Sequence, residues 1–83
     1  MYELIFDEKV LSFLEDLQKD LRERIFRKLQ TTKENPLIYF ERLAGRTDYK
    51  LRVGDYRVIA DIDNNKKIIC VNVIGHRKNI YKK

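Results

Sequence analysis

The segment Asp48–Arg57, D-Y-K-L-R-V-G-D-Y-R, has the pattern of two short strands joined by a tight turn at Gly54-Asp55. Apolar and cationic residues alternate along it, as they do in a strand with one buried and one exposed face. With a two-residue turn, Arg52 lies directly opposite Arg57. Two like charges that face each other across a hairpin destabilise it. We therefore expect an anion to bind between these two arginines.

Two further segments extend this hairpin into a three-stranded antiparallel meander. The pattern predicts strands over residues 49–53, 56–62 and 67–74. The connection Asp63–Lys66 is rich in Asn and Asp, which is typical of a tight turn. If the second hairpin closes on this turn, Arg57 faces Asn72. Arg52, Arg57 and Asn72 then form a polar row across three strands, and we expect Arg52 and Asn72 to take part in binding the anion.

This register divides the sheet into two faces. The inner face is apolar and is expected to receive the helices; it comprises Tyr49, Leu51, Val53, Tyr56, Val58, Ala60, Ile69, Val71 and Val73. The outer face carries Ile59, Cys70 and Ile74 beside Lys50 and the polar row. A shift of one residue would exchange the two faces, so the prediction of the polar row depends on the register.

The N-terminal part of the chain predicts one strand and two amphipathic helices. Residues 2–6 are rich in strand-forming types. Asp7 is a suitable N-cap for a helix over residues 7–18, whose apolar residues recur at helical spacing. Asp20, with Glu23 three residues later, predicts the cap of a second helix. The connection between the two helices is short, which favours an antiparallel helical hairpin.

The only proline, Pro36, cannot continue the second helix, and we expect residues 37–45 to form a connecting loop. The predicted fold class is therefore α+β. It has an N-terminal strand, a two-helix antiparallel hairpin and then the three-stranded antiparallel meander, with the helices packed on one face of a single sheet. We expect the 83 residues, 1–83, to form one domain.

Composition narrows the class of protein. An apolar fraction of 43% is typical of a folded chain, and a net charge of +5 favours a polyanionic partner. No apolar run approaches the roughly 20 residues of a membrane helix, and the N-terminus does not have the pattern of a secretory signal. The single cysteine, Cys70, excludes an internal disulfide and a cysteine-based metal cluster. These features indicate a cytoplasmic protein that does not enter a membrane.

The chain resembles the RelE family, small toxins of bacterial and archaeal toxin–antitoxin pairs. The resemblance covers nearly the whole chain. It rests on the predicted order of elements and on three segments: Leu43-Ala44-Gly45, the run Y-K-L-R-V-G-D-Y-R-V-I, and the closing G-H-R-K-N-I-Y. It implies a metal-independent endoribonuclease without a cofactor that cleaves mRNA in the ribosomal A site. The ribose 2′-hydroxyl attacks the adjacent phosphate and leaves a 2′,3′-cyclic phosphate and a 5′-hydroxyl.

The resemblance also implies roles for individual residues. Lys50 matches the lysine proposed to accept the 2′-hydroxyl proton, and Arg57 matches the arginine that holds the scissile phosphate. Arg77 matches the arginine that stabilises the transition state or the leaving group. Tyr81 matches a tyrosine that stacks on a base or orients the nucleophile. Arg52, beside them in the same strand, is a further expected phosphate contact.

The sequence departs from the family pattern in two places that bear on the chemistry. Asp48 stands near the position where better-known members have a second lysine. Some relatives use a glutamate as the base and a histidine as the acid, and Glu41 and His76 match those positions. The choice between Lys50 and the pair Glu41 and His76 therefore stays open. We also expect the C-terminal helix of many relatives to be absent or very short here.

The resemblance implies partners as well as an activity. They are the ribosome with its mRNA, and a small acidic RelB-like antitoxin that forms a hetero-oligomeric complex with the toxin. The main alternative function is that of the related ParE toxins, which inhibit DNA gyrase and do not cleave RNA. A nucleic-acid-binding module without activity is a further alternative.

Overall fold

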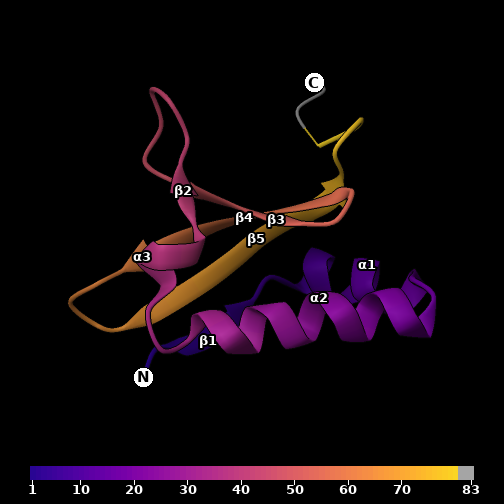
Figure 1. The fold of residues 1–83 in the computed structure, drawn as a ribbon, viewed down its shortest axis with the longest axis horizontal. Helices are drawn as coiled ribbons and strands as arrows, with labels where there is room; N and C mark the ends of the chain where they lie inside the picture. Colours follow the sequence, from indigo (N-terminus) through magenta and orange to yellow (C-terminus); the bar gives the residue numbers. More distant parts are fainter. Residues whose placement is uncertain (81–83) are drawn as a thin grey trace.

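A mixed sheet of five strands organises the protein, and the computed structural model describes residues 1–80 of it. The elements follow one another as β1 (Glu3–Phe6), α1 (Glu8–Asp16), α2 (Lys19–Thr32), α3 (Pro36–Tyr39), β2 (Glu41–Arg42), β3 (Tyr49–Val53), β4 (Tyr56–Asp63) and β5 (Ile68–His76). The strand order is β1-β5-β4-β3-β2; β1 is parallel to β5, and the other neighbours are antiparallel. Both long helices cover the same face of the sheet (Figure 1). The predicted α+β class is confirmed.

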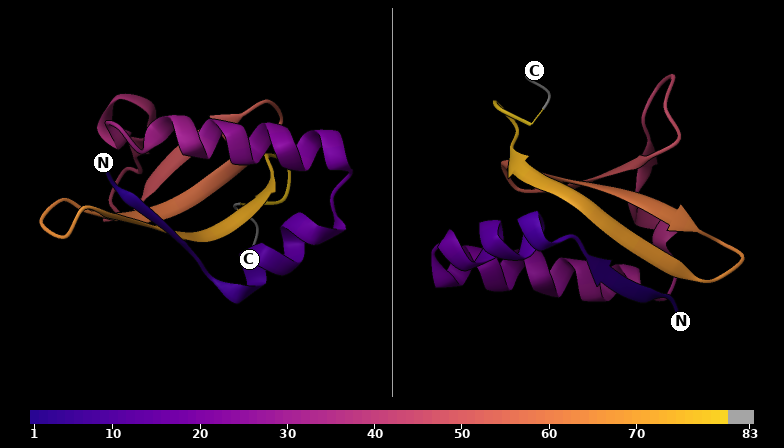
Figure 2. Two further views of the ribbon diagram at one scale, coloured as in Figure 1. Left: turned by 90° about the horizontal axis from the view of Figure 1, so that it is seen from below. Right: turned by 180° about the vertical axis from the view of Figure 1, so that it is seen from behind.

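The two helices bury one apolar stripe each against the sheet. Asp7 caps α1 as predicted, because its carboxylate accepts a hydrogen bond from the Lys9 N–H at 2.9 Å. Val10 and Leu14 of α1 and Ile25 and Leu29 of α2 are the deeply buried residues of these stripes. They meet the inner face of the central strands. Figure 2 shows the two helices joined at one end, with β1 beside β5.

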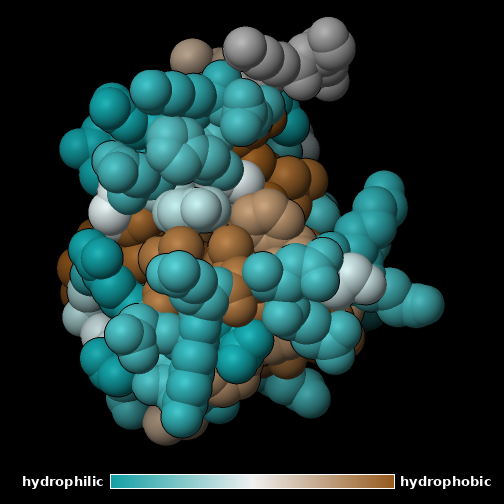
Figure 3. Space-filling view, turned by 90° about the vertical axis from the view of Figure 1, so that its right-hand side faces the viewer, coloured by the Kyte–Doolittle hydropathy of each residue, from teal (hydrophilic) through white to brown (hydrophobic). Residues whose placement is uncertain are grey.

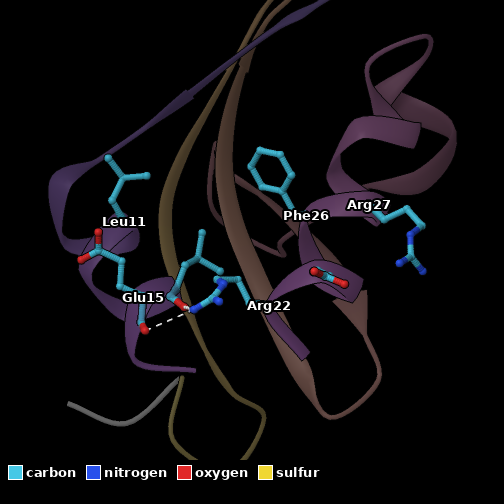
Figure 4. Close-up of a pocket in the computed structure, with 7 residues that line it drawn as sticks. Leu11, Glu15, Arg22, Phe26 and Arg27 are labelled. Carbon is cyan, nitrogen blue, oxygen red and sulfur yellow. Dashed lines mark hydrogen bonds between the residues drawn. The ribbon is translucent and has the colours of Figure 1, made fainter. Parts of the chain in front are cut away.

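The predicted cap of the second helix is wrong. α2 begins at Lys19 with Gln18 as its N-cap, so Asp20 already lies inside the helix. The junction is held by Arg22, whose backbone N–H donates to the Gln18 carbonyl oxygen at 2.9 Å. The Arg22 guanidinium reaches the last carbonyl oxygens of α1, those of Leu14, Glu15 and Leu17, at 3.3–3.5 Å (Figure 4). Arg22 thus donates hydrogen bonds to carbonyl oxygens at the C-terminal end of α1, and its backbone N–H bonds to the N-cap residue of α2.

The register of the β3–β4 hairpin is as predicted. Val53 pairs with Tyr56 and Arg52 pairs with Arg57 across the turn. Gly54 has a φ of 58°, a left-handed conformation that glycine adopts without a steric penalty. Leu51 and Val58, on the inner face of this hairpin, are buried in the core. The local turn chemistry and the alternation of residues therefore point to the same register.

The predicted register of the β4–β5 hairpin is wrong. Asp63 pairs with Ile68, so the turn holds four residues and the pairing is shifted by two from the predicted one. The Asp63 carboxylate accepts hydrogen bonds from two N–H groups of this turn, each at 3.0 Å, and stabilises the longer loop. Farther from this turn the strands form a bulge, because Ala60 pairs with Val71, whereas Ile59, the residue before Ala60 in β4, pairs with Val73.

Asn72 is the extra residue in this bulge, and it changes which later residues of β5 face the core. Ile74, predicted on the outer face, is buried at 5% exposure, whereas Val73, predicted on the inner face, is 45% exposed. Arg57 pairs with Gly75 rather than with Asn72. The predicted polar row of Arg52, Arg57 and Asn72 is therefore not formed.

The segment predicted as a connecting loop contains two short elements. Pro36 opens the one-turn helix α3 at its first position, where the missing N–H costs nothing. Phe40 then anchors the chain in the core, and β2 pairs with the start of β3. Glu41 becomes the cross-strand partner of Lys50. Among residues 1–80, no helix is long and apolar enough to cross a membrane.

Candidate active site

Arg57 is a buried cation held at the β3–β4 turn. The residue is 9% exposed, and its Nη1 donates to the carbonyl oxygens of Gly54 and Tyr56, both at 2.9 Å. Both bonds use the same nitrogen, and a guanidinium has five N–H donors in a planar fork. Among the described residues, no carboxylate lies within ion-pair distance of it. A fixed, partly satisfied cation of this kind is suited to bind a phosphate oxygen.

Arg77 reaches the same turn from the end of β5. Its backbone N–H donates to the Asp55 carbonyl oxygen at 2.7 Å, and its Nε lies 3.5 Å from the Asp55 carboxylate. The guanidinium is more than half exposed, so this ion pair leaves it accessible. The chain then folds back, and the Ile80 side chain lies against Gly75, the cross-strand partner of Arg57. The turn therefore brings Arg57 and Arg77 to one end of the sheet.

Lys50, Arg52 and Arg57 are placed on one face by the regular β3–β4 ladder. Lys50 precedes Arg52 by two residues in β3, and Arg52 faces Arg57. Glu41 on the short edge strand β2 pairs with Lys50. The two residues that the sequence offered as alternative bases are thus cross-strand neighbours. No hydrogen bond or ion pair joins them among the described contacts.

Two predicted site residues lie apart from this cluster. The His76 ring packs edge-on against Tyr56 at 5.4 Å, and Tyr56 in turn contacts Phe13 of α1, so His76 lies toward the helices. His76 and Glu41 are therefore not brought together. Asn72 donates to the Asp61 carboxylate at 3.0 Å. The prediction for Tyr81 falls outside the described residues.

Sequence reasoning centred the site on the β3–β4 hairpin but missed the contacts that its turn makes. Gly54 and Asp55 had been considered only as turn formers, yet their carbonyl oxygens hold Arg57 and Arg77. Arg24 was not among the predicted site residues, yet a Cβ on Gly54 would lie 2.9 Å from its guanidinium. The sequence shows a basic stripe on this helix, which fits a solvated face as well as an RNA contact; Arg24, Arg27 and Lys28 share one face because they recur at i, i+3 and i+4.

Apolar surface lies beside these cations. Figure 3, which views the end of the molecule where the helices join, shows an apolar band between two polar regions. A cavity of about 440 Å³ is lined by Phe13, Leu17, Tyr56 and Ile80, among others. A second hollow, of about 560 Å³, lies between α1 and α2 and is lined by Leu11, Leu14 and Phe26 together with charged residues (Figure 4). Surfaces of this kind mark sites of protein contact.

The fold and the cation cluster define a small α+β protein with a cationic face at one end of its sheet, and the comparisons specify its family. The model of the family described as "ParE toxin of type II toxin-antitoxin system, parDE" matches residues 4–81. The chain is 32% identical over 80 residues to the mRNA interferase toxin RelE of Escherichia coli (strain K12). The aligned region covers 93% of this chain and 84% of that protein.

Solved structures agree with this result. The isolated E. coli RelE toxin superposes with a TM-score of 0.80 at 29% identity and covers 92% of this chain and 84% of that one. The toxin in the intact E. coli RelBE toxin–antitoxin complex gives a TM-score of 0.76 at 30% identity, with 92% and 96% covered. The chain belongs to the RelE/ParE superfamily of toxins of type II toxin–antitoxin systems. The family predicted from the sequence and its fold are confirmed.

Proposed function

We propose that this protein is a RelE-type toxin that cleaves mRNA in the ribosomal A site by attack of a ribose 2′-hydroxyl on the adjacent phosphate. The observation that carries the proposal is the pair of facing arginines, Arg52 and Arg57, with Arg77 held at the same turn. The mRNA interferase name of the E. coli relative supports the same activity. Metal-independent cleavage of this kind relies on fixed cations to stabilise the charge that develops on the phosphate.

The order of the cations fits the geometry of the reaction. In-line displacement places the attacking and leaving oxygens on opposite sides of the phosphorus. Lys50 lies on the side of the arginine pair away from the turn, and Arg77 lies on the turn side. We assign the scissile phosphate to Arg57 and Arg52, proton removal to Lys50 or its neighbour Glu41, and stabilisation of the leaving oxygen to Arg77. By resemblance, Tyr81 is assigned either to base stacking or to orientation of the nucleophile.

A partner and a location follow from this proposal. The RelBE complex contains a relative of this chain together with its antitoxin, and we propose that a small acidic RelB-like antitoxin binds this protein in a hetero-oligomer. The apolar band beside the cations would be covered in such a complex, as interfaces that bury a central apolar patch require. Action on ribosomes places the protein in the cytoplasm.

Toeprinting of mRNA on translating ribosomes tests the activity. Wild-type protein should produce cuts at A-site codons. Arg57→Gln should reduce the cleavage rate about 100-fold or more, because a fixed donor to the developing charge is lost. Lys66→Gln, an exposed lysine in the distant β4–β5 turn, is the charge-matched control and should cleave at the wild-type rate. Thermal unfolding of each variant separates lost chemistry from lost folding.

The same assay distinguishes the two candidate bases. If Lys50 removes the proton, Lys50→Gln should lower the rate far more than Glu41→Gln, and the reverse result would assign the base to Glu41. Absence of ribosome-dependent cleavage by the folded wild-type protein would refute the proposed function. Inhibition of DNA supercoiling by gyrase in its place would establish the ParE-like alternative.

A further inference from the structure

A second basic pocket lies at the edge of the β3–β4 hairpin, where α2 approaches it. Its volume is about 320 Å³, and it is lined by Arg24, Arg27, Lys28, Thr31, Arg52, Val53 and Gly54. The four α2 residues recur at i, i+3, i+4 and i+7, so one face of the helix points toward the hairpin. Four of the lining side chains are cationic and none is a carboxylate.

The charges in this pocket are not neutralised within the described part of the chain. The ion pairs of residues 1–80 involve Arg46 and Arg77, and neither Arg24, Arg27 nor Arg52 has a carboxylate within range. Like charges one helical turn apart destabilise a helix. Lys28 is partly accommodated by the Tyr39 ring, which lies 5.3 Å from its Nζ. The arrangement becomes favourable when an anion enters the pocket.

Gly54 gives the pocket its shape. A Cβ at this position would lie 2.9 Å from Nη2 of Arg24, so the absence of a side chain lets the guanidinium approach the turn. The carbonyl oxygen of the same Gly54 accepts the hydrogen bond from Arg57. Because β2 pairs only with Tyr49 and Lys50 among the described residues, the rest of β3 forms an open edge beside the pocket. A ligand can therefore enter from solvent.

The chemistry of the lining favours nucleic acid over protein. Three of the four cations are arginines, whose planar fork matches the oxygens of a phosphate. Val53 is the only large apolar residue of the lining, whereas the hollow between α1 and α2 offers the apolar contacts that a protein partner needs. Arg27 lines both, but its side chain points away from Leu11 and Glu15 of that hollow (Figure 4).

We propose that this pocket binds a backbone phosphate of RNA other than the scissile one. Arg52 joins the two sites, because it lines the pocket and faces Arg57 across the hairpin. An RNA strand that places one phosphate at Arg57 can then place another phosphate on the α2 side of the same hairpin. The proposal rests on the proposed function for the identity of the ligand, which is either the message or ribosomal RNA.

The test measures binding of a 2′-O-methyl RNA hexanucleotide, which lacks the attacking hydroxyl, as a function of salt. Arg24→Gln/Arg27→Gln should weaken binding roughly five-fold or more and lower the slope of log K against log salt by about 0.7, the value for one phosphate on a single strand. Lys9→Gln/Lys19→Gln removes the same charge from exposed positions outside the pocket and should leave the slope unchanged. An unchanged slope in the Arg24/Arg27 variant, with the protein folded, overturns the proposal.

A second variant tests the pocket without removing either arginine. Thr31→Asp places a carboxylate among the cations and should reduce oligonucleotide binding while the thermal unfolding temperature is retained or raised. Binding at the wild-type level by this variant would count against the pocket. If a polyglutamate peptide of equal charge binds the wild-type pocket more tightly than the oligonucleotide, the pocket belongs to a protein partner and the proposal fails.

Binding to ribosomes identifies the source of the phosphate. If the Arg24/Arg27 variant binds ribosomes without mRNA more weakly than the wild type does, the phosphate belongs to ribosomal RNA. If its binding is weaker than that of the wild type only when mRNA fills the A site, the phosphate belongs to the message. Because the hexanucleotide cannot be cleaved, its binding is independent of the activity. A wild-type protein that binds it through the pocket but does not cut mRNA would refute the proposed function and leave the pocket standing.

Discussion

The two hairpins of this protein share β4 but are built differently. The β3–β4 hairpin turns in two residues and pairs regularly, and its turn holds Arg57 and Arg77. The β4–β5 hairpin turns in four residues and contains a bulge at Asn72. The short hairpin provides a rigid frame for the cations. The long hairpin supplies core residues and carries the chain from the far end of the sheet back to the site.

This difference shows how the fold separates two tasks. A site that binds phosphate needs its donors fixed in position, and a tight turn with few degrees of freedom fixes them. The bulge has a different role. Residues three apart in a regular strand point to opposite faces, but the bulge allows both Val71 and Ile74 to face the helices. If the proposed site is correct, the short hairpin can therefore tolerate little change, while the long hairpin is constrained mainly by the core.

The largest expected effect concerns the two residues after the bulge. Ile74→Ala should lower the free energy of unfolding by about 2–5 kcal/mol, because a buried side chain leaves a cavity. Val73→Ala, the matched control one residue earlier, should change it by about 1 kcal/mol or less, because Val73 is 45% exposed. Urea denaturation measures both values. Equal losses, or a larger loss at Val73, would contradict the position of the bulge.

Val73 and Ile74 also show which part of the sheet register could not be predicted from the sequence. The β3–β4 register follows from local features, namely the Gly54-Asp55 turn and strict alternation, and the sequence predicts it correctly. The loop Asn64–Lys67 has a composition that fits turns of more than one length, and a bulge at Asn72 has no local signature. The faces of Val73 and Ile74 depend on both and were predicted wrongly, because tertiary packing decides them.

The candidate site was predictable to a similar extent. The facing of Arg52 and Arg57 needs only the turn, so it was predicted. The pairing of Glu41 with Lys50 was not, because residues 37–45 lack the periodicity of a strand and β2 is formed only by its contact with β3. The pocket beside α2 depends on how the helix crosses the sheet, which no local pattern in the sequence determines.

An intermediate effect is expected at the turn of the short hairpin. Gly54→Ala places an alanine at a φ of 58°, which costs about 1–2 kcal/mol of folding free energy. Its Cβ would also displace the Arg24 guanidinium, because the two would be 2.9 Å apart. We expect weaker binding of the RNA hexanucleotide in addition to the loss of stability, measured by titration and by urea denaturation.

Gly45→Ala is the matched control for this change. Gly45 has a φ of 70°, and no atom lies within 4 Å of a Cβ built on it. It should therefore lose a similar amount of stability, about 1–2 kcal/mol, and keep the affinity for RNA. If both variants lose affinity equally, the contact between Arg24 and Gly54 has no part in binding.

The smallest effect is expected in the turn of the long hairpin. Lys67 has a φ of 59°, a strained conformation for a lysine, and asparagine tolerates it better because its short side chain bonds locally. Lys67→Asn loses the contact of the lysine Nζ with the Tyr2 ring at 5.1 Å, worth about 0.5–1 kcal/mol at an exposed site. Relief of about 1–2 kcal/mol of strain should exceed this loss.

The expected net gain of about 0.5 kcal/mol corresponds to a rise in Tm of roughly 2–4 °C for a chain of this size. Lys66→Asn makes the same substitution one residue earlier, where the backbone is not left-handed, and should give no such rise. Calorimetry of the two variants measures the difference, and mRNA cleavage should be unchanged in both. A gain in stability at Lys67 without a change in cleavage would mean that the strained backbone of this turn is not needed for activity. This is the result expected if the long hairpin contributes to the core and the short hairpin to the chemistry.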